Sequence, residues 1–476
     1  MRAHIAKQGP DGRVSGVELL GCVLASSSLG LAVGFLAGLV PGLHMNNIAA
    51  ALTAYASVVL ALFGWMAEDG IEDSAGVLVA CFISAAMIAH MFAEAITSTY
   101  VGIPSEDVVS VLPAHRLARA GLGRLAVRAS ADGALVGVIL SVALFPVVCH
   151  IMGGPTGLYS MLHDLMVIPL VAFSVILVLS EGSPSLKPWL RYPHWMMRVA
   201  RATVVFLASG VLGVVVLRTN FYACPVPDFP WIADPFVAKS SLLLPMFAGL
   251  FGIPGLLLSI GARPARTVGS VAEVPVRSVV SAKSALLSVL GGIIVGWIPG
   301  MTSGSATTIC SPTVREVGGS DQLQESLRFI SLYSSISASG AVFAVGALFV
   351  ISRARSGCMD AAAFFLGDEL LSETWIANTT PIASILLAVT ISALVSSLMI
   401  RKLDGRLMFA NKVLCSKSVA LAAMVFVVAL SMALTGIRGS MVMMTAVFLG
   451  LIPPLVGVRR IQLMGCLLVP IALTLA

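Results

Sequence analysis

Two short polar stretches, each opening with proline and glycine, interrupt an otherwise apolar chain and could bind an anion. A proline cannot continue a helix, so one helix is expected to end at each stretch and another to begin a few residues later. The amide groups at such a helix start lack partners within the helix and carry partial positive charge, which suits carboxylate or phosphate oxygens. Unwound carbonyls and hydroxyls could instead hold a coupling cation. The predicted substrate-binding residues are Pro41, Gly42, Leu43, His44, Asn46, Asn47, Pro299, Gly300, Thr302, Ser303 and Ser305.

A second polar cluster follows in the first half of the chain, where His90 and Glu94 are four residues apart and so share one helical face. An ionisable pair inside a membrane segment indicates a functional site, while a structural pair near a helix end fits the pattern equally well. The hydroxyl-rich run 334–340 is the second-half analogue by its order along the chain. The candidate residues for ion or proton coupling are His90, Glu94, Thr97, Ser98, Thr99 and Ser335.

No enzyme signature accompanies these clusters. The chain has no HExxH, GxSxG or P-loop motif, and its eight cysteines are scattered without metal-ligand spacing. We therefore predict no catalytic residue, no metal site and no cofactor, with a bound sodium ion as the one candidate. A hydrolase built on His44, His90 and Glu94 would require those three side chains to converge, and it is the least favoured class.

The two interruptions are related by a fixed offset of 258 residues. Gly34-x3-Gly38-x2-Pro41-Gly42 and Gly292-x3-Gly296-x2-Pro299-Gly300 agree at all four defining positions. A GxxxG pattern alone is typical of a helix-packing face. Two copies in register, each followed by polar residues, favour two structurally repeated halves whose broken helices or re-entrant hairpins form a central site.

The elements that carry these motifs are expected to be membrane helices. Of the 476 residues, 58% are hydrophobic and 11% are charged, against about 25% charged in soluble domains. This composition predicts an all-α polytopic membrane protein, and the formal net charge of +6 does not indicate a nucleic-acid partner. The predicted spans are 18–40, 48–66, 75–95, 133–152, 163–180, 199–217, 241–260, 284–298, 328–351, 378–400, 417–435, 439–456 and 460–476. The predicted divisions are an N-terminal cytoplasmic segment (1–17), a first repeat (18–217), a connecting region (218–283) and a second repeat (284–476).

Charge in the connecting segments predicts that the two halves are inverted, because Lys and Arg concentrate on cytoplasmic loops. The loop 113–132 carries four arginines, whereas its second-half counterpart 356–375 carries acidic charge and no Lys or Arg. The loop 401–417 is basic, whereas 153–164 has no Lys or Arg. The basic segments that precede both interruptions oppose this interpretation. The N-terminus is predicted to be cytoplasmic, in a multi-pass protein of the cell membrane.

The order of several motifs resembles the large membrane subunit of tripartite tricarboxylate transporters, the TctA family, and most closely its archaeal-type branch. Ala114 stands where relatives often have glycine, and the run 334–340 lacks an asparagine expected there. The motifs that carry the resemblance are Pro41-Gly42-Leu43-His44 with Asn46, Gly102-Ile103-Pro104 with Leu112-Pro113-Ala114-His115-Arg116, Ala248-Gly249-Leu250-Phe251-Gly252, Pro299-Gly300-x-Thr302-Ser303 with Ala306-Thr307, and Gly450-Leu451-Ile452-Pro453-Pro454-Leu455.

This resemblance implies a permease, not an enzyme, that moves citrate-like di- or tricarboxylates by symport with sodium or protons. Expected partners are the organic anion, the lipid bilayer, a small membrane subunit, an extracytoplasmic binding protein and a second copy in a homodimer. The alternative function is translocation of a lipid-linked phosphate such as polyprenyl phosphate, because the same helix starts would bind a phosphate group.

Overall fold

The computed structural model describes residues 16–40, 43–66, 75–101, 108–120, 122–154, 156–163, 167–179, 181, 188–218, 242–261, 281–298, 301–314, 322–403 and 417–475. Helices and the turns between them make up these segments, and no strand occurs within them. Both Pro-Gly pairs, Pro41-Gly42 and Pro299-Gly300, lie outside the described residues, as does the motif Gly102-Ile103-Pro104.

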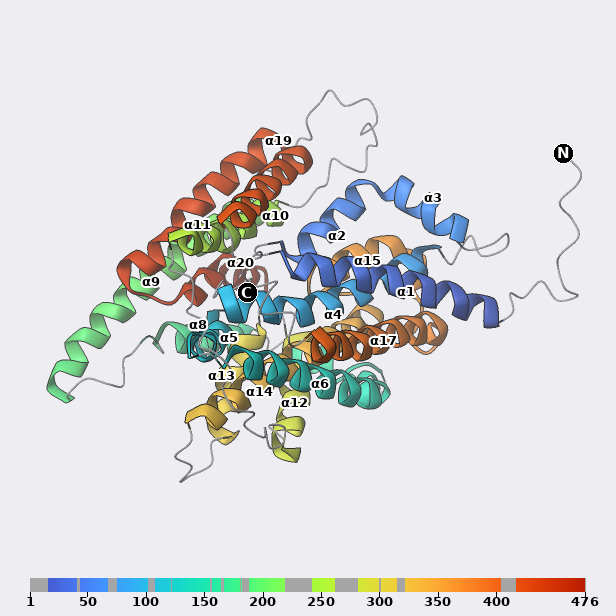
Figure 1. The fold of residues 1–476 in the computed structure, drawn as a ribbon, viewed down its shortest axis with the longest axis horizontal. Helices are drawn as coiled ribbons and strands as arrows, with labels where there is room; N and C mark the ends of the chain where they lie inside the picture. The colour runs from blue at the N-terminus through green and yellow to red at the C-terminus, as the bar shows by residue number, and fades with distance from the viewer. Residues whose placement is uncertain are drawn as a thin grey trace, which may run out of the picture.

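Seven helices within the described residues are long and apolar enough to cross a membrane, so the chain is an all-α polytopic membrane protein as predicted. Figure 1 shows their arrangement. In chain order the elements are α1 (Gly16–Gly38), α2 (Met45–Ala54), α3 (Ala56–Met66), α4 (Ala75–Val101), α5 (Val108–Arg119), α6 (Gly123–Met152), α7 (Leu158–His163), α8 (Val167–Leu179), α9 (Pro188–Arg218), α10 (Leu243–Phe247), the π-helix η3 (Ala248–Gly252), α11 (Ile253–Gly261), α12 (Ala282–Trp297), α13 (Ser303–Val314), α14 (Gln322–Ile351), α15 (Gly357–Leu366), α16 (Asp368–Ser372), α17 (Thr379–Leu403), α19 (Lys417–Val456), the 3₁₀-helix η4 (Arg460–Met464) and α20 (Gly465–Leu475).

The predicted loops are the main error of the sequence interpretation. Segment 113–132 forms most of α5 and the start of α6, and segment 356–375 contains α15 and α16. These short helices bury apolar side chains against the long ones: Ala114 and Leu117 of α5 belong to one buried cluster with Ala126 of α6. Burial of such a narrow apolar face stabilises helices too short and too polar to be recognised as spans.

One predicted span differs in detail: segment 48–66 is divided at Tyr55 into α2 and α3. The predicted spans 417–435 and 439–456 correspond to two helices within α19, which are separated by a kink at Gly436. The φ angle of Gly436 is 62°, in the left-handed region that only glycine adopts at little cost.

A hairpin in each half contains the interruption. In the first hairpin, the Cys22 thiol near the start of α1 donates to the carbonyl oxygen of Met66 at the end of α3, with a sulfur–oxygen distance of 3.2 Å. In the second, the Cys310 thiol of α13 lies 4.0 Å from the carbonyl oxygen of Leu287 in α12. The chain therefore runs inward along one helix, breaks, and returns beside it.

Each hairpin lies parallel to the long helix that follows it. Ser26 of α1 donates to the carbonyl oxygen of Leu78 at the start of α4, whereas Gly38 at the end of α1 faces His90. In the second half, Gly292 and Gly296 of α12 face Ser339 and Phe343 of α14 in the same sense. The same pairing of hairpin and long helix thus occurs in both halves.

The two long helices α4 and α14 run in opposite directions. Tyr100 at the end of α4 contacts Gly123 at the start of α6. Helix α6 is parallel to α14, since Gly133 and Gly137 face Ser331 and Ser335. Because α1 is parallel to α4, the start of α1 lies at the opposite end of the bundle from the start of α6.

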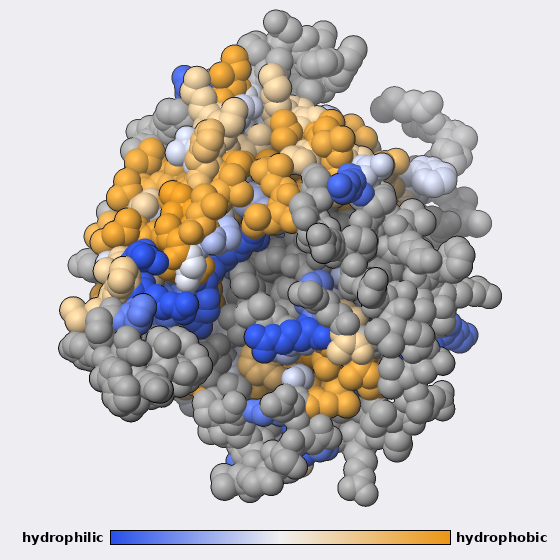
Figure 2. Space-filling model, turned by 60° about the vertical axis from the view of Figure 1, so that its left-hand side comes forward, coloured by the Kyte–Doolittle hydropathy of each residue, from blue (hydrophilic) through white to orange (hydrophobic). Residues whose placement is uncertain are grey.

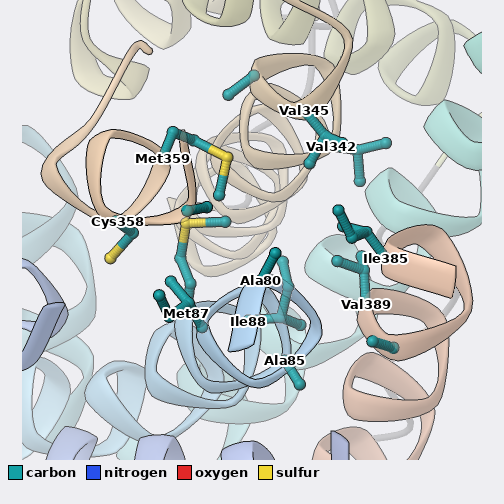
Figure 3. Packing of buried hydrophobic residues seen from close by; sticks show 14 of the residues in the cluster. Ala80, Ala85, Met87, Ile88, Val342, Val345, Cys358, Met359, Ile385 and Val389 are labelled. Atoms are coloured by element: carbon teal, nitrogen blue, oxygen red, sulfur yellow. The ribbon is translucent and has the colours of Figure 1, made fainter. Parts of the chain in front are cut away.

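The centre of the bundle is apolar and closely packed. Figure 3 shows Ile88 of α4, Val342 of α14, Met359 of α15 and Val389 of α17 in one cluster. All four side chains are buried. This packing fixes the positions of the two long helices on which the hairpins rest.

A second group of helices, α8–α11, α19 and α20, packs around its own apolar cluster and forms the left-hand part of Figure 1. The backbone of η3 at Gly249 packs closely against the carbonyl oxygen of Met443 in α19. The backbone of α19 at Gly450 packs in the same way against the carbonyl oxygen of Leu250. Figure 2 shows a broad apolar expanse on the face turned forward, as expected of a surface in contact with lipid.

Candidate functional site

Both interruptions separate two helices, as predicted. Helix α1 ends at Gly38 and α2 begins at Met45, while α12 ends at Trp297 and α13 begins at Ser303. The new helices are capped by residues 258 positions apart. The Nδ1 atom of His44 accepts from the Asn46 amide at 3.1 Å, and the Thr302 hydroxyl accepts from the Ser305 amide at 3.2 Å. Equivalent positions therefore satisfy the first free amides of both helix starts.

The glycines of the repeated motif serve close helix packing. A Cβ atom at Gly38 would lie 2.6 Å from the carbonyl oxygen of His90, and one at Gly296 would lie 2.7 Å from the Cβ of Phe343. Small residues at these points allow the helix backbones to approach closely. The packing interpretation of GxxxG thus holds for the glycines, and the packing sets the depth of each break.

Asn46 connects the first break to α15. Its side-chain oxygen accepts from the backbone amide of Cys358 at 3.1 Å and from the Cys358 thiol at 3.3 Å. The start of α15 is also capped by Ser356, whose hydroxyl accepts from the Met359 amide at 3.3 Å. Two helix starts, those of α2 and α15, therefore meet at Asn46. The side chain of Asn47 lies outside the described residues.

The hydroxyls of the second break contact one another. The Thr302 and Ser305 hydroxyl oxygens are 2.8 Å apart, and the Ser303 carbonyl accepts from Thr307 at 2.6 Å. Ser305 is buried, whereas Thr302 and Ser303 are partly exposed. These contacts leave the second break lined by short polar groups without charge.

Ionisable side chains lie beside the first break. His90 is buried, its Nε2 is 3.6 Å from the Glu94 carboxylate, and its ring centroid is 5.5 Å from that of His44. Thr97 donates to the carbonyl oxygen of Gly38 at 3.2 Å, so it holds the last turn of α1. By the packing of Gly38 and Gly296, the second-half counterpart of His90 is Phe343. The two breaks are therefore chemically different.

The remaining predicted coupling residues do not gather at this cluster. Ser98 donates to the carbonyl of Ala95 within its own helix, and the Thr99 carbonyl lies 3.2 Å from Nδ1 of His115 in α5. Ser335 is buried on α14 where Gly137 of α6 approaches. Of the six residues, His90, Glu94 and Thr97 adjoin the first break.

Arg355 is a charged residue near both breaks that the sequence analysis did not single out. It lies in the connector 352–356 between α14 and α15, and its Nη2 donates to the Tyr159 hydroxyl at 3.0 Å. Burial lowers the pKa of its guanidinium, although arginine remains charged in proteins. Arg353 and Arg355 directly precede the acidic segment 356–375, so both arginines lie outside the segment whose charge predicts inversion.

Paired broken helices within a bundle of membrane-crossing helices define a class of protein, the membrane permeases. The chain belongs to the tripartite tricarboxylate transporter TctA family, whose model matches residues 24–465, nearly the whole chain. It is also 25% identical, over 369 residues, to an uncharacterized protein of Methanocaldococcus jannaschii, covering 77% of each chain. No solved structure matches the chain. The protein is thus a multi-pass membrane component of a tricarboxylate transport system, in a family whose members are transporters.

Proposed function

We propose that the protein is a secondary active transporter of di- or tricarboxylates, driven by a sodium or proton gradient and binding its substrate at the two helix breaks. The observation that carries the proposal is the pair of hairpins, each broken and capped at positions 258 residues apart. Helix starts bearing partial positive charge suit carboxylate oxygens, and broken backbone at membrane depth is tolerated where it is buried or lines a cavity.

The antiparallel course of α4 and α14 supports inverted halves. It also bears on which end of the bundle faces the cytoplasm. The starts of α1 and α6 lie at opposite ends of the bundle, whereas the N-terminal segment and 113–132 are both predicted to be cytoplasmic. Only one can be cytoplasmic. We favour the α6 end, since Lys and Arg concentrate on the cytoplasmic side and this end carries Arg116, Arg124, Arg128, Arg328, Arg401 and Lys402.

Coupling by a proton would use the first break alone. His90 and Glu94 are ionisable there, whereas the second break offers hydroxyls. Sodium coupling would instead draw on carbonyl and hydroxyl oxygens at either break. Members of this family act in tripartite systems, and we expect this chain to work with a small membrane subunit and an extracytoplasmic binding protein.

Uptake of radiolabelled citrate into proteoliposomes tests the proposal. We expect uptake that exceeds equilibration under a sodium or proton gradient and that Thr302→Val reduces at least tenfold. The matched control is Thr445→Val, a hydroxyl that only contacts its own helix, at Met441 of α19. Citrate uptake that only equilibrates would refute the gradient drive. Translocation of a polyprenyl phosphate in place of citrate would refute carboxylate transport and support the lipid-linked alternative.

A further inference from the structure

We propose that Arg355, together with the indole of Trp297, binds an oxyanion group of the transported substrate between the two helix breaks. This inference rests on the proposed function for the identity of the anion, a carboxylate, and on the geometry for the site. Arg355 lies outside the repeated Pro-Gly motifs, and Trp297 occupies one of the variable positions of the second motif.

The position of Arg355 relates it to both breaks. Its Nη2 donates to the hydroxyl of Tyr159, and its guanidinium carbon lies 5.9 Å from the centre of the Tyr159 ring. The centroid of the Tyr159 ring is also 6.1 Å from that of Trp297, and Trp297 is the last residue of α12 before the second break. Three residues after Arg355, Cys358 donates its amide to Asn46 of the first break.

The donors of this cluster exceed its acceptors. The Arg355 Nε and the Trp297 Nε1 are both buried, and neither has a hydrogen-bond acceptor among the described residues. The Trp297 side chain is 1% exposed. No carboxylate within the described part of the chain forms an ion pair with Arg355. A buried charge and buried N–H groups left without partners are costly, so a ligand that supplies acceptor oxygens would stabilise the site.

The chemistry of these donors selects an oxyanion. A guanidinium presents N–H groups in a planar fork that matches the two oxygens of a carboxylate or phosphate. The indole Nε1–H is a donor only, so it cannot coordinate a cation and instead suits an acceptor oxygen. The contact with Tyr159 orients the guanidinium while leaving its Nε edge for the ligand. A di- or tricarboxylate could thus place one carboxylate here and another at a capped helix start.

Thermal-shift titration of the purified full-length protein with citrate and, separately, inorganic phosphate tests this site, because a ligand that binds the folded state raises the melting temperature. We expect Arg355→Gln to weaken citrate binding about 10- to 100-fold, the range for a charged hydrogen bond. Trp297→Phe should weaken it less. Arg353→Gln is the matched control: it removes an exposed arginine two residues away, and citrate binding should be unchanged.

Arg355→Lys guards against a folding defect, because it keeps the charge and loses the planar fork; we expect binding intermediate between wild type and Arg355→Gln. Equal citrate affinity in wild type and Arg355→Gln would overturn the inference and leave carboxylate transport standing. Phosphate binding that depends on Arg355, without citrate binding, would keep the anion site and refute the carboxylate. If neither anion shifts the wild-type melting temperature, both proposals fail.

Discussion

Replacing Gly38 by alanine should force α1 away from α4 at the point where the first hairpin breaks. The added Cβ would lie 2.6 Å from the carbonyl oxygen of His90 and 2.8 Å from the Cβ of Ala93, whereas ordinary contacts begin at 3.4 Å. Relief requires a separation of about 0.8 Å, and a gap of that size forfeits a quarter to a half of the dispersion energy between facing atoms. We expect a loss of about 2–3 kcal/mol in unfolding free energy, at the upper end of the usual cost of overpacking.

The measurement is unfolding in mixed micelles of increasing denaturing detergent, followed by circular dichroism. Gly21→Ala is the matched control, since Gly21 lies on the same helix with nothing within 4 Å of the added Cβ. That control should be neutral or stabilised by up to about 1 kcal/mol, because alanine favours a helix over glycine. Equal stability of the two variants would refute the close packing of α1 on α4.

Four further substitutions separate structural from functional roles. Asn46→Ala should lower stability by about 1–2 kcal/mol, because the α15 amide that it accepts from loses its partner; an unchanged melting curve would contradict that contact. His90→Phe, which copies the second-half residue, should abolish uptake driven by a proton gradient; retained proton-driven uptake would exclude this coupling site. Glu181→Gln should cost about 1.5–3 kcal/mol, since the buried carboxylate accepts charged hydrogen bonds from Arg459 and Gln462 at 3.0 Å each; an unchanged stability in the same unfolding assay would argue against these contacts. Asp132→Asn, in the half-exposed pair with Arg401, should change stability by less than about 1 kcal/mol, and a larger loss would show a buried role.

The helical spans and the breaks were predictable because they depend on local chemistry. Apolar runs of about 20 residues form membrane helices, and a proline with a following cap ends one helix and starts another, as His44 and Thr302 do. The same pattern of glycine and proline occurs twice in the sequence, at an offset of 258 residues, so each copy supports the prediction made from the other. These features need no knowledge of distant contacts.

The remaining features depend on tertiary contacts that no local sequence pattern predicts. Helix α5 is held by burial of Ala114 and Leu117 against α6, whereas the four arginines of segment 113–132 predict a loop. Arg355 lies in a short connector outside any motif, and its significance comes from Tyr159, 196 residues earlier. Asn46 was predicted as a ligand from its place after Pro-Gly; its bond to Cys358 is 312 residues distant and was invisible in the sequence.

The seams of small residues between hairpin and long helix have a mechanical consequence. Because Gly34 and Gly38 seat α1 on the backbone of α4, and Gly292 and Gly296 seat α12 on that of α14, neither pair can slide without a steric collision. Contacts with the outer helices are instead made by side chains: Val40 packs against Leu256 and Ala420, and Met301 packs against the cluster around α19. We therefore expect the cargo to change sides by displacement of each hairpin and its long helix as one rigid block against α8–α11, α19 and α20.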